Sequence, residues 1–172
     1  MRFMNYKCKI ASLEEVSKKC DYEIEIHPND NKWIEFKKIA LKNFYTRITY
    51  IGLLDDKIIT EATAIISEDD LDMQNKEGLI DKDTAYLTGF RTNKEYEGKG
   101  YFSKLYKYME NDLKQKGFKK LTLGVEPNEV RNMQIYFKWG YTNYIKTAYE
   151  EYSSDGNEEP EEMIGNYYYK IL

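Results

Sequence analysis

The stretch Glu95-Tyr96-Glu97-Gly98-Lys99-Gly100-Tyr101-Phe102 decides how the rest of the chain is interpreted. An apolar run from Ala85 to Phe90 precedes it and predicts a strand, and an amphipathic run over 101–113 follows it and predicts a helix. Two glycines at this junction let the backbone approach a ligand closely, and the first turn of a helix leaves several N–H groups without partners. Together with Lys99 and the positive end of the helix dipole, these donors predict a site for a pyrophosphate-bearing cofactor.

Two other classes of glycine loop fit this stretch less well. The nucleotide-triphosphate loop requires a glycine at the position that Asn93 occupies here. The dinucleotide fingerprint requires a third glycine where this chain has Ser103, although Glu126 lies near the place of its acidic residue. An antiparallel hairpin is expected over 47–66, and a dinucleotide fold is instead built from repeated βαβ units. A dinucleotide-binding oxidoreductase therefore stays only as an alternative.

The composition indicates a single folded domain over residues 1–172. The net charge of −4 argues against nucleic acid as a partner and mildly favours a cationic or amine substrate. No run is long enough to span a membrane, and the first residues lack the apolar core of a secretory signal. Cys8 and Cys20 have no metal-ligand spacing, so a cytoplasmic protein with reduced thiols and no metal is expected.

Apolar patterns along the chain predict an α/β order of elements. Alternation predicts strands, four-residue spacing predicts helices, and the acidic stretch 67–83 is expected to form a long surface loop. The expected strands cover 6–10, 47–54, 57–66, 84–92, 121–125, 141–152 and 164–171, and the expected helices lie near 13–20, 33–44, 101–113 and 130–139. Residues 153–157 are expected to form a loop between the last two strands.

This order, with two motifs, resembles the GCN5-related N-acetyltransferase superfamily. Gly98 and Gly100 fall on the glycine positions of that family's cofactor loop. In Ile135-Tyr136-Phe137-Lys138-Trp139-Gly140-Tyr141, Tyr136 and Gly140 match the family's later motif. The resemblance implies a GNAT-like α/β (α+β) fold, with a central mixed, mostly antiparallel, splayed sheet flanked by helices.

The resemblance also implies that acetyl-CoA, as acetyl donor, binds along the strand and the glycine turn. In the family, the pantetheine arm pairs with the backbone of the strand before the turn. Gly89 inside that strand fits a bulge or a close backbone approach. The cofactor-binding residues that the resemblance implies are Phe90, Arg91, Thr92, Glu97, Gly98, Lys99, Gly100, Tyr101, Phe102 and Asn132.

Transfer of an acetyl group to an amine requires proton transfers at both ends of the reaction. A lysine-like amine has a pKa of about 10.4, so a base must remove a proton before it attacks the thioester. Glu126, at a strand end, and Glu61, in the expected hairpin, are the two candidates for this base. The departing thiolate profits from an acid, and Tyr136 matches the family position of that acid. Neither cysteine lies in a nucleophile motif, so direct transfer is expected.

A second interpretation of the same fold stays open. Glu97 stands where the family usually has Arg or Gln, and Phe102 where it usually has Gly or Ala. These departures favour a non-catalytic acyl-CoA-binding or sensor domain. For an enzyme, the expected acceptor is a small-molecule or peptide amine, with no nucleic acid or membrane partner. A monomer and a homodimer are both compatible with the sequence.

Overall fold

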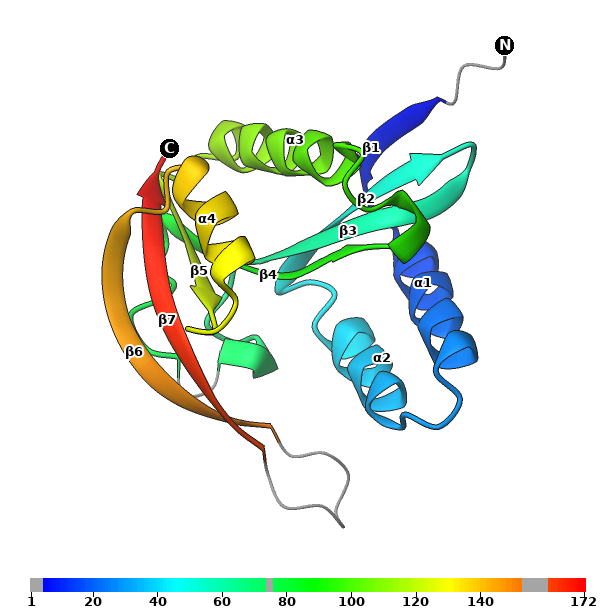
Figure 1. Ribbon diagram of the computed structural model, residues 1–172, viewed down its shortest axis with the longest axis horizontal. Coiled ribbons are helices and arrows are strands. Elements are labelled where there is room, and N and C mark those ends of the chain that lie inside the picture. Colours follow the sequence, from blue (N-terminus) through cyan, green and yellow to red (C-terminus); the bar gives the residue numbers. More distant parts are fainter. Residues whose placement is uncertain (1–4, 74–75, 153–160) are drawn as a thin grey trace.

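The computed structural model describes residues 5–73, 76–152 and 161–172, and its strands form one seven-stranded sheet in the order β1-β2-β3-β4-β5-β7-β6 (Figure 1). Strands β4 and β5 run parallel and all other neighbours pair antiparallel. The strands are β1 (Tyr6–Ile10), β2 (Arg47–Leu54), β3 (Lys57–Ile65), β4 (Thr84–Thr92), β5 (Lys120–Val125), β6 (Asn143–Tyr152) and β7 (Glu161–Ile171). The helices are α1 (Leu13–Ile26), α2 (Lys32–Lys42), α3 (Tyr101–Gln115) and α4 (Val130–Lys138), with 3₁₀ turns η1 (Leu71–Met73) and η2 (Lys94–Tyr96). The expected mixed, mostly antiparallel sheet flanked by helices is confirmed.

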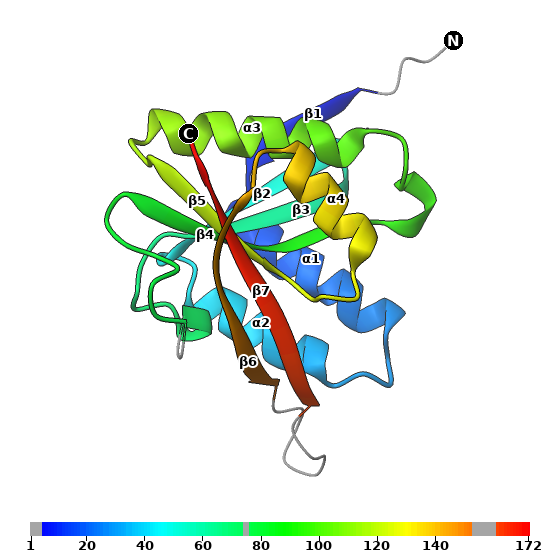
Figure 2. The ribbon, with the colours of Figure 1, turned by 60° about the vertical axis from the view of Figure 1, so that its left-hand side comes forward.

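The two faces of the sheet carry separate cores because successive strand residues point in opposite directions. On β2, Tyr50 packs in the core that contains Leu105 and Met109 of α3. The next residue, Ile51, packs in the core that contains Val16 of α1 and the partly buried apolar side chains of α2. Helices α3 and α4 therefore cover one face, and α1 and α2 cover the other (Figures 1 and 2).

Local sequence signals explain two of these boundaries. Asp55 and Asp56 have positive φ angles of 47° and 69°, which a two-residue hairpin turn between right-twisted strands requires. Ser12 and Glu15 form the capping box that starts α1. The helix runs six residues beyond the expected end at residue 20, to Ile26. Its buried stripe continues through a carboxylate, Glu23, which the apolar pattern does not reveal.

The expectation of a surface loop over 67–83 is wrong for part of that stretch. Asp70 is buried and accepts hydrogen bonds from Nε of Arg47, at 2.8 Å, and from Oγ1 of Thr46, at 2.7 Å. Leu79 and Ile80 are buried in a core cluster with Ile65, Tyr86 and Tyr167 of the sheet. A paired carboxylate and two apolar anchors thus hold an acidic segment against the sheet. The loop expected at 153–157 lies outside the described residues.

Strands β4 and β5 separate in the middle of the sheet. They pair from Thr84 to Leu87, while β5 continues to pair with β7 as far as Val125. Beyond that point β4 bulges. The register shifts because Thr88 to Arg91 on β4 lie opposite Thr63 to Glu61 on β3, one residue more than on the partner strand, and Gly89 within the bulge has a φ of +66°. Of the alternatives that the sequence leaves open at Gly89, the structure shows the bulge. The splayed half of β4 leads directly into the glycine turn.

Candidate functional site

The glycine turn joins η2 to α3 and is built on two left-handed residues. Gly98 and Gly100 have φ angles of +71° and +80°, which side-chain-bearing residues rarely adopt. An added Cβ at either position would meet no atom within 4 Å, so the space in front of the turn is open. Gly100 caps α3, whose first N–H groups therefore face this space. The turn has the backbone geometry of an anion site.

A cleft of about 590 Å³, here called the turn cleft, lies between the end of β4, the turn, α3 and α4. Nine of the ten cofactor-binding residues expected from the sequence line it, namely Phe90, Arg91, Thr92, Glu97, Gly98, Gly100, Tyr101, Phe102 and Asn132. Lys99 is not among its lining residues, and its ammonium donates to the Glu95 carbonyl at 2.8 Å. The sequence-predicted set thus gathers around one cavity.

Two cations of the turn cleft were missed by the sequence analysis. Arg131 and Lys138 line it from α4, with Ile135 between them. Spacings of four and seven residues place all three on one face of the helix. This spacing is the signal that identifies them once α4 is assigned. They bring positive charge to the wall opposite the turn.

Tyr136 lies at the apolar wall of the turn cleft. Its ring centroid is 5.9 Å from that of Phe90 on β4 and 5.9 Å from that of Trp139. Burial, reinforced by the charge of Glu129, raises the pKa of Tyr136 to about 12. The phenol therefore stays protonated at neutral pH and is available as a hydrogen-bond or proton donor.

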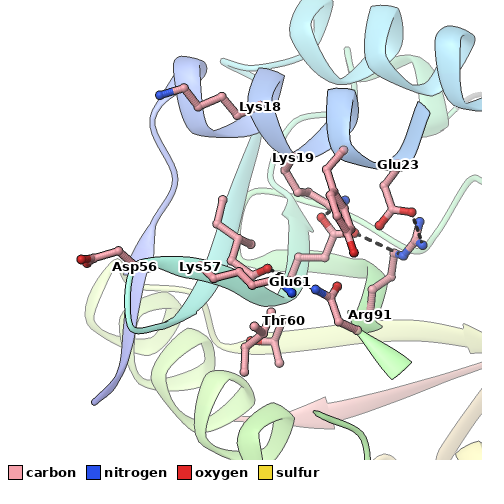
Figure 3. A pocket seen from close by; sticks show the side chains of 12 residues that line it. Lys18, Lys19, Glu23, Asp56, Lys57, Thr60, Glu61 and Arg91 are labelled. Atoms are coloured by element: carbon pink, nitrogen blue, oxygen red, sulfur yellow. Dashed lines mark hydrogen bonds and ion pairs between the residues drawn. The ribbon is translucent and has the colours of Figure 1, made fainter. Parts of the chain in front are cut away.

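A second cavity of about 210 Å³, here called the charged pocket, lies between α1 and the strands β3 and β4 (Figure 3). Arg91 lines both cavities. Its neighbour Phe90 contacts Phe102 and Tyr136, on the side of α3 and α4, whereas Arg91 contacts Trp33 and Glu23, on the side of α1 and α2. The two cavities therefore meet at one strand from opposite faces of the sheet.

The floor of the charged pocket is a network of paired charges. Glu61 on β3 is the cross-strand partner of Arg91 on β4, and its Oε1 lies 3.6 Å from Nε of Arg91. Lys19 of α1 forms an ion pair with Glu61, and Arg91 donates to Glu23 at 2.8 Å. Figure 3 shows Lys19 and Glu23 reaching from α1 toward these strand residues. The indole of Trp33 lies 4.1 Å from the Arg91 guanidinium carbon.

Burial raises the pKa of the Glu61 carboxyl, against the opposing effects of Lys19 and Arg91. Its side chain is 8% exposed, and it faces the charged pocket. A carboxyl with a raised pKa at the floor of a cavity is a chemically suitable proton acceptor. The sequence analysis missed Glu23, Lys19 and Trp33, which come from α1 and α2 and carry no local motif.

The other candidate base, Glu126, follows the last residue of β5 and is half-buried. It lines neither the turn cleft nor the charged pocket. The two cysteines are free thiols, and burial raises the pKa of both Cys8 and Cys20. A raised pKa disfavours the thiolate that a cysteine nucleophile needs.

The described residues contain neither a cluster of metal-ligating side chains nor a helix that could cross a membrane. In residues 5–73, 76–152 and 161–172, no group of three or more histidine, cysteine or carboxylate side chains is arranged to hold a metal ion. Within the same ranges, no helix is both long and apolar enough to cross a membrane.

Comparison with known families identifies the class of protein. A family model described as the acetyltransferase (GNAT) family matches residues 10–141, most of the chain. The chain belongs to this family, as the resemblance of its two motifs indicated. A search of curated proteins gives no match.

Solved structures of low sequence identity share the fold. The ribosomal-protein-S18-alanine N-acetyltransferase from Escherichia coli is 14% identical with a TM-score of 0.66, over 98% of this chain and 94% of that one. The PaiA N-acetyltransferase from Thermoplasma acidophilum, in complex with coenzyme A, is 14% identical with a TM-score of 0.60, over 98% and 100%. A GNAT family acetyltransferase from Elizabethkingia anophelis with acetyl-CoA bound is 13% identical with a TM-score of 0.63, over 98% and 99%. At these identities the likeness is one of fold.

Proposed function

We propose that the protein is an acetyl-CoA-dependent N-acetyltransferase that moves an acetyl group directly onto a primary amine. One observation carries this proposal: two cavities of different chemistry meet at Arg91, on opposite faces of the same splayed strand. Two reactants that enter from opposite faces would meet at that strand. Family membership supports the reaction class, and two structural neighbours were solved with coenzyme A or acetyl-CoA bound.

The turn cleft is the proposed site of acetyl-CoA. The pantetheine arm would pair with the backbone of β4 around Phe90 to Thr92, where β4 has left β5. The pyrophosphate would lie at the glycine turn and the N-terminus of α3, where N–H donors and the helix dipole favour an anion. Arg131 and Lys138 line the same cleft and would add positive charge. Glu97 also lines the cleft, and its side chain must point away from the phosphates.

The charged pocket is the proposed site of the acceptor, with Glu61 as base. Glu61 would remove one proton from the acceptor ammonium, directly or through water, and leave a neutral amine. The amine nitrogen then attacks the thioester carbon, and backbone N–H groups of the splayed strand would stabilise the oxyanion that forms. The register partner of Glu61 is Arg91, at the strand where the thioester is expected.

Tyr136 is the proposed acid for the departing thiolate. As the carbon–sulfur bond breaks, the phenol would donate its proton to sulfur. The second proton of the nitrogen would return through solvent to the Tyr136 phenolate, and Glu61 would release the first proton to solvent. The net products are the N-acetylated amine, the free thiol of coenzyme A and one proton. Because the pKa of Tyr136 is raised to about 12, the donor form is present throughout the neutral range.

The test combines calorimetry and turnover. We expect the protein to bind acetyl-CoA but neither NADH nor ATP, and to release thiol from acetyl-CoA when a primary amine is added. Tyr136→Phe keeps the ring and removes the proton, so kcat should fall about 100-fold with little change in the KM for acetyl-CoA. The matched control is Tyr45→Phe, at a tyrosine that is 88% exposed. Binding of acetyl-CoA without thiol release for any amine would instead identify a non-catalytic acyl-CoA-binding domain, and binding of NADH a dinucleotide enzyme.

A further inference from the structure

The size of the charged pocket limits what its occupant can be. Its volume of about 210 Å³ lies below the ~300–1,000 Å³ of pockets that enclose drug-sized ligands. The part of an acceptor that enters it is therefore small. Helix α1 forms one wall with Lys18, Lys19, Tyr22 and Glu23, and β3 and β4 form the other with Lys57, Glu61 and Arg91.

The charge of the lining does not complement a simple cation. The pocket is lined by four cationic side chains, Lys18, Lys19, Lys57 and Arg91, and by three carboxylates, Glu23, Asp56 and Glu61. The lining thus has one positive charge in excess, although the whole chain carries a net charge of −4. A cation that enters the pocket therefore meets cationic side chains as well as carboxylates.

The carboxylate that would receive the acceptor ammonium already has a partner. Lys19 forms an ion pair with Glu61, and its side chain is only 15% exposed. An acceptor ammonium that takes the place at Oε2 of Glu61 displaces Lys19. The second buried carboxylate, Glu23, is bonded to Arg91 at 2.8 Å. A displaced Lys19 has to share Glu23 with Arg91 or move to the exposed Asp56, and a poorly compensated buried charge is costly.

We propose that the acceptor is a small zwitterionic amine of the amino-acid class, whose ammonium takes the place of Lys19 at Glu61 while its carboxylate takes up Lys19. This inference rests on the proposed N-acetyltransferase function and names its substrate class. Insertion of a zwitterion between an existing cation and anion leaves every charge paired. A plain amine satisfies Glu61 and removes the buried partner of Lys19.

Two lysines at the edge of the pocket also favour an acceptor that carries a carboxylate. Lys18 pairs with Glu14 at 2.6 Å and Lys57 pairs with Glu95 at 2.9 Å, and both partners are exposed and lie outside the pocket lining. Exposed pairs of this kind are weak and exchange partners readily. Both lysines therefore add attraction for a carboxylate that enters the pocket.

The experiment compares amino acids with the amines that differ from them only by the carboxylate. Acetylation rates are measured for serine against ethanolamine, phenylalanine against phenethylamine, and methionine against 3-(methylthio)propylamine. In the wild-type protein we expect kcat/KM to favour the amino acid about tenfold or more in at least one pair. Equal rates within every pair, or faster transfer to the plain amines, would overturn the inference and leave the N-acetyltransferase function standing. No transfer to any amine would mean that the proposed function fails, and the inference with it.

Variants of the pocket lysines test the exchange of partners itself. Lys19→Met keeps the length of the side chain and removes its charge, so the plain amine no longer removes the partner of a buried cation and the ratio of amino acid to amine should fall to about one or below. An unchanged ratio in a folded Lys19→Met protein would overturn the inference. Lys57 is exposed, so Lys57→Gln should leave the fold intact. It should lower the ratio of amino-acid to plain-amine kcat/KM about two- to threefold. Lys107→Gln, at an exposed position on α3, is the matched control and should leave the ratio unchanged.

Discussion

The two cavities on either side of β4 are lined by different chemical groups. The turn cleft is formed by two left-handed glycines, the start of a helix and a group of aromatic rings. The charged pocket is formed by ionised side chains from α1, β3 and β4 that are paired with one another. Backbone donors serve a ligand whose phosphates never change, whereas side-chain charges can be altered one at a time. The difference agrees with the proposal that the cleft binds a constant donor and the pocket selects a particular acceptor.

This contrast predicts that substitutions act on one reactant at a time. A change in the charged pocket should alter acceptor kinetics and leave acetyl-CoA binding intact, and a change in the glycine turn should do the reverse. The contact between the two cavities is Arg91, which lines both. Residues that reach only one of them provide the cleanest tests.

The largest effect is expected from Glu61→Gln. Loss of the base should lower kcat/KM at pH 7 about 10³-fold while acetyl-CoA binding, measured by calorimetry, stays the same. Burial raises the pKa of the Glu61 carboxyl, and the base acts in its ionised form. Wild-type activity should therefore fall as the pH drops through this raised pKa, above the ordinary value of about 4.3.

The variant should lack this acid limb of the pH profile, because glutamine does not titrate. Glu25→Gln, at an exposed position on α1, is the matched control and should keep both the rate and the profile. A Glu61→Gln protein with an unchanged profile would assign the role of base to another group, and Glu126 would be the next candidate.

An effect of about 100-fold is expected from Gly100→Glu, now on the affinity for acetyl-CoA. Gly100 has a φ of +80°, which costs a side-chain-bearing residue about 1–2 kcal/mol, and the new carboxylate would repel the phosphates at the start of α3. Because an added Cβ there meets no atom within 4 Å, the loss would not come from a clash with the protein.

Gly78→Glu is a closely matched control for this variant. Gly78 has a φ of +82°, an added Cβ there also meets nothing within 4 Å, and the residue does not line the turn cleft. It carries the same strain and the same charge, so acetyl-CoA affinity should be normal. Equal loss of affinity in both variants would show that strain, and not the turn, is responsible.

How far each cavity can be predicted from the sequence follows from the same contrast. The turn cleft is lined by two short stretches, so Gly98, Gly100 and Tyr136 were predicted from motifs that resemble those of the family, whereas Arg131 and Lys138 were not. The charged pocket joins Lys19 to Glu61 and Glu23 to Arg91, the second pair across 68 residues of chain, and no local pattern records such pairings. A sequence shows which residues are charged, but which charges meet depends on how α1 packs on the sheet.

Buried carboxylates are a second feature that the sequence does not predict. Glu23 lies on the buried stripe of α1, and Asp70 is buried within an acidic stretch, because each has an arginine partner from a strand. A carboxylate is predicted to lie at the surface because charged side chains are rarely buried. It can be buried when a cation pairs with it, and the sequence does not show which cation that is. Glu61 was found because strand alternation fixes the face on which it lies, whatever its partner is.

The smallest effect is expected from Trp33→Leu, on the acceptor side alone. The indole lies 4.1 Å from the Arg91 guanidinium, and its loss should loosen that arginine and raise the acceptor KM about fivefold, in line with the ~1 kcal/mol of a cation–π contact. Trp33→Phe keeps an aromatic face and should restore most of the loss. Acetyl-CoA affinity should not move in either variant, because Trp33 does not line the turn cleft. If it does move, the two cavities are coupled through Arg91, and that arginine then positions the donor as well as the acceptor.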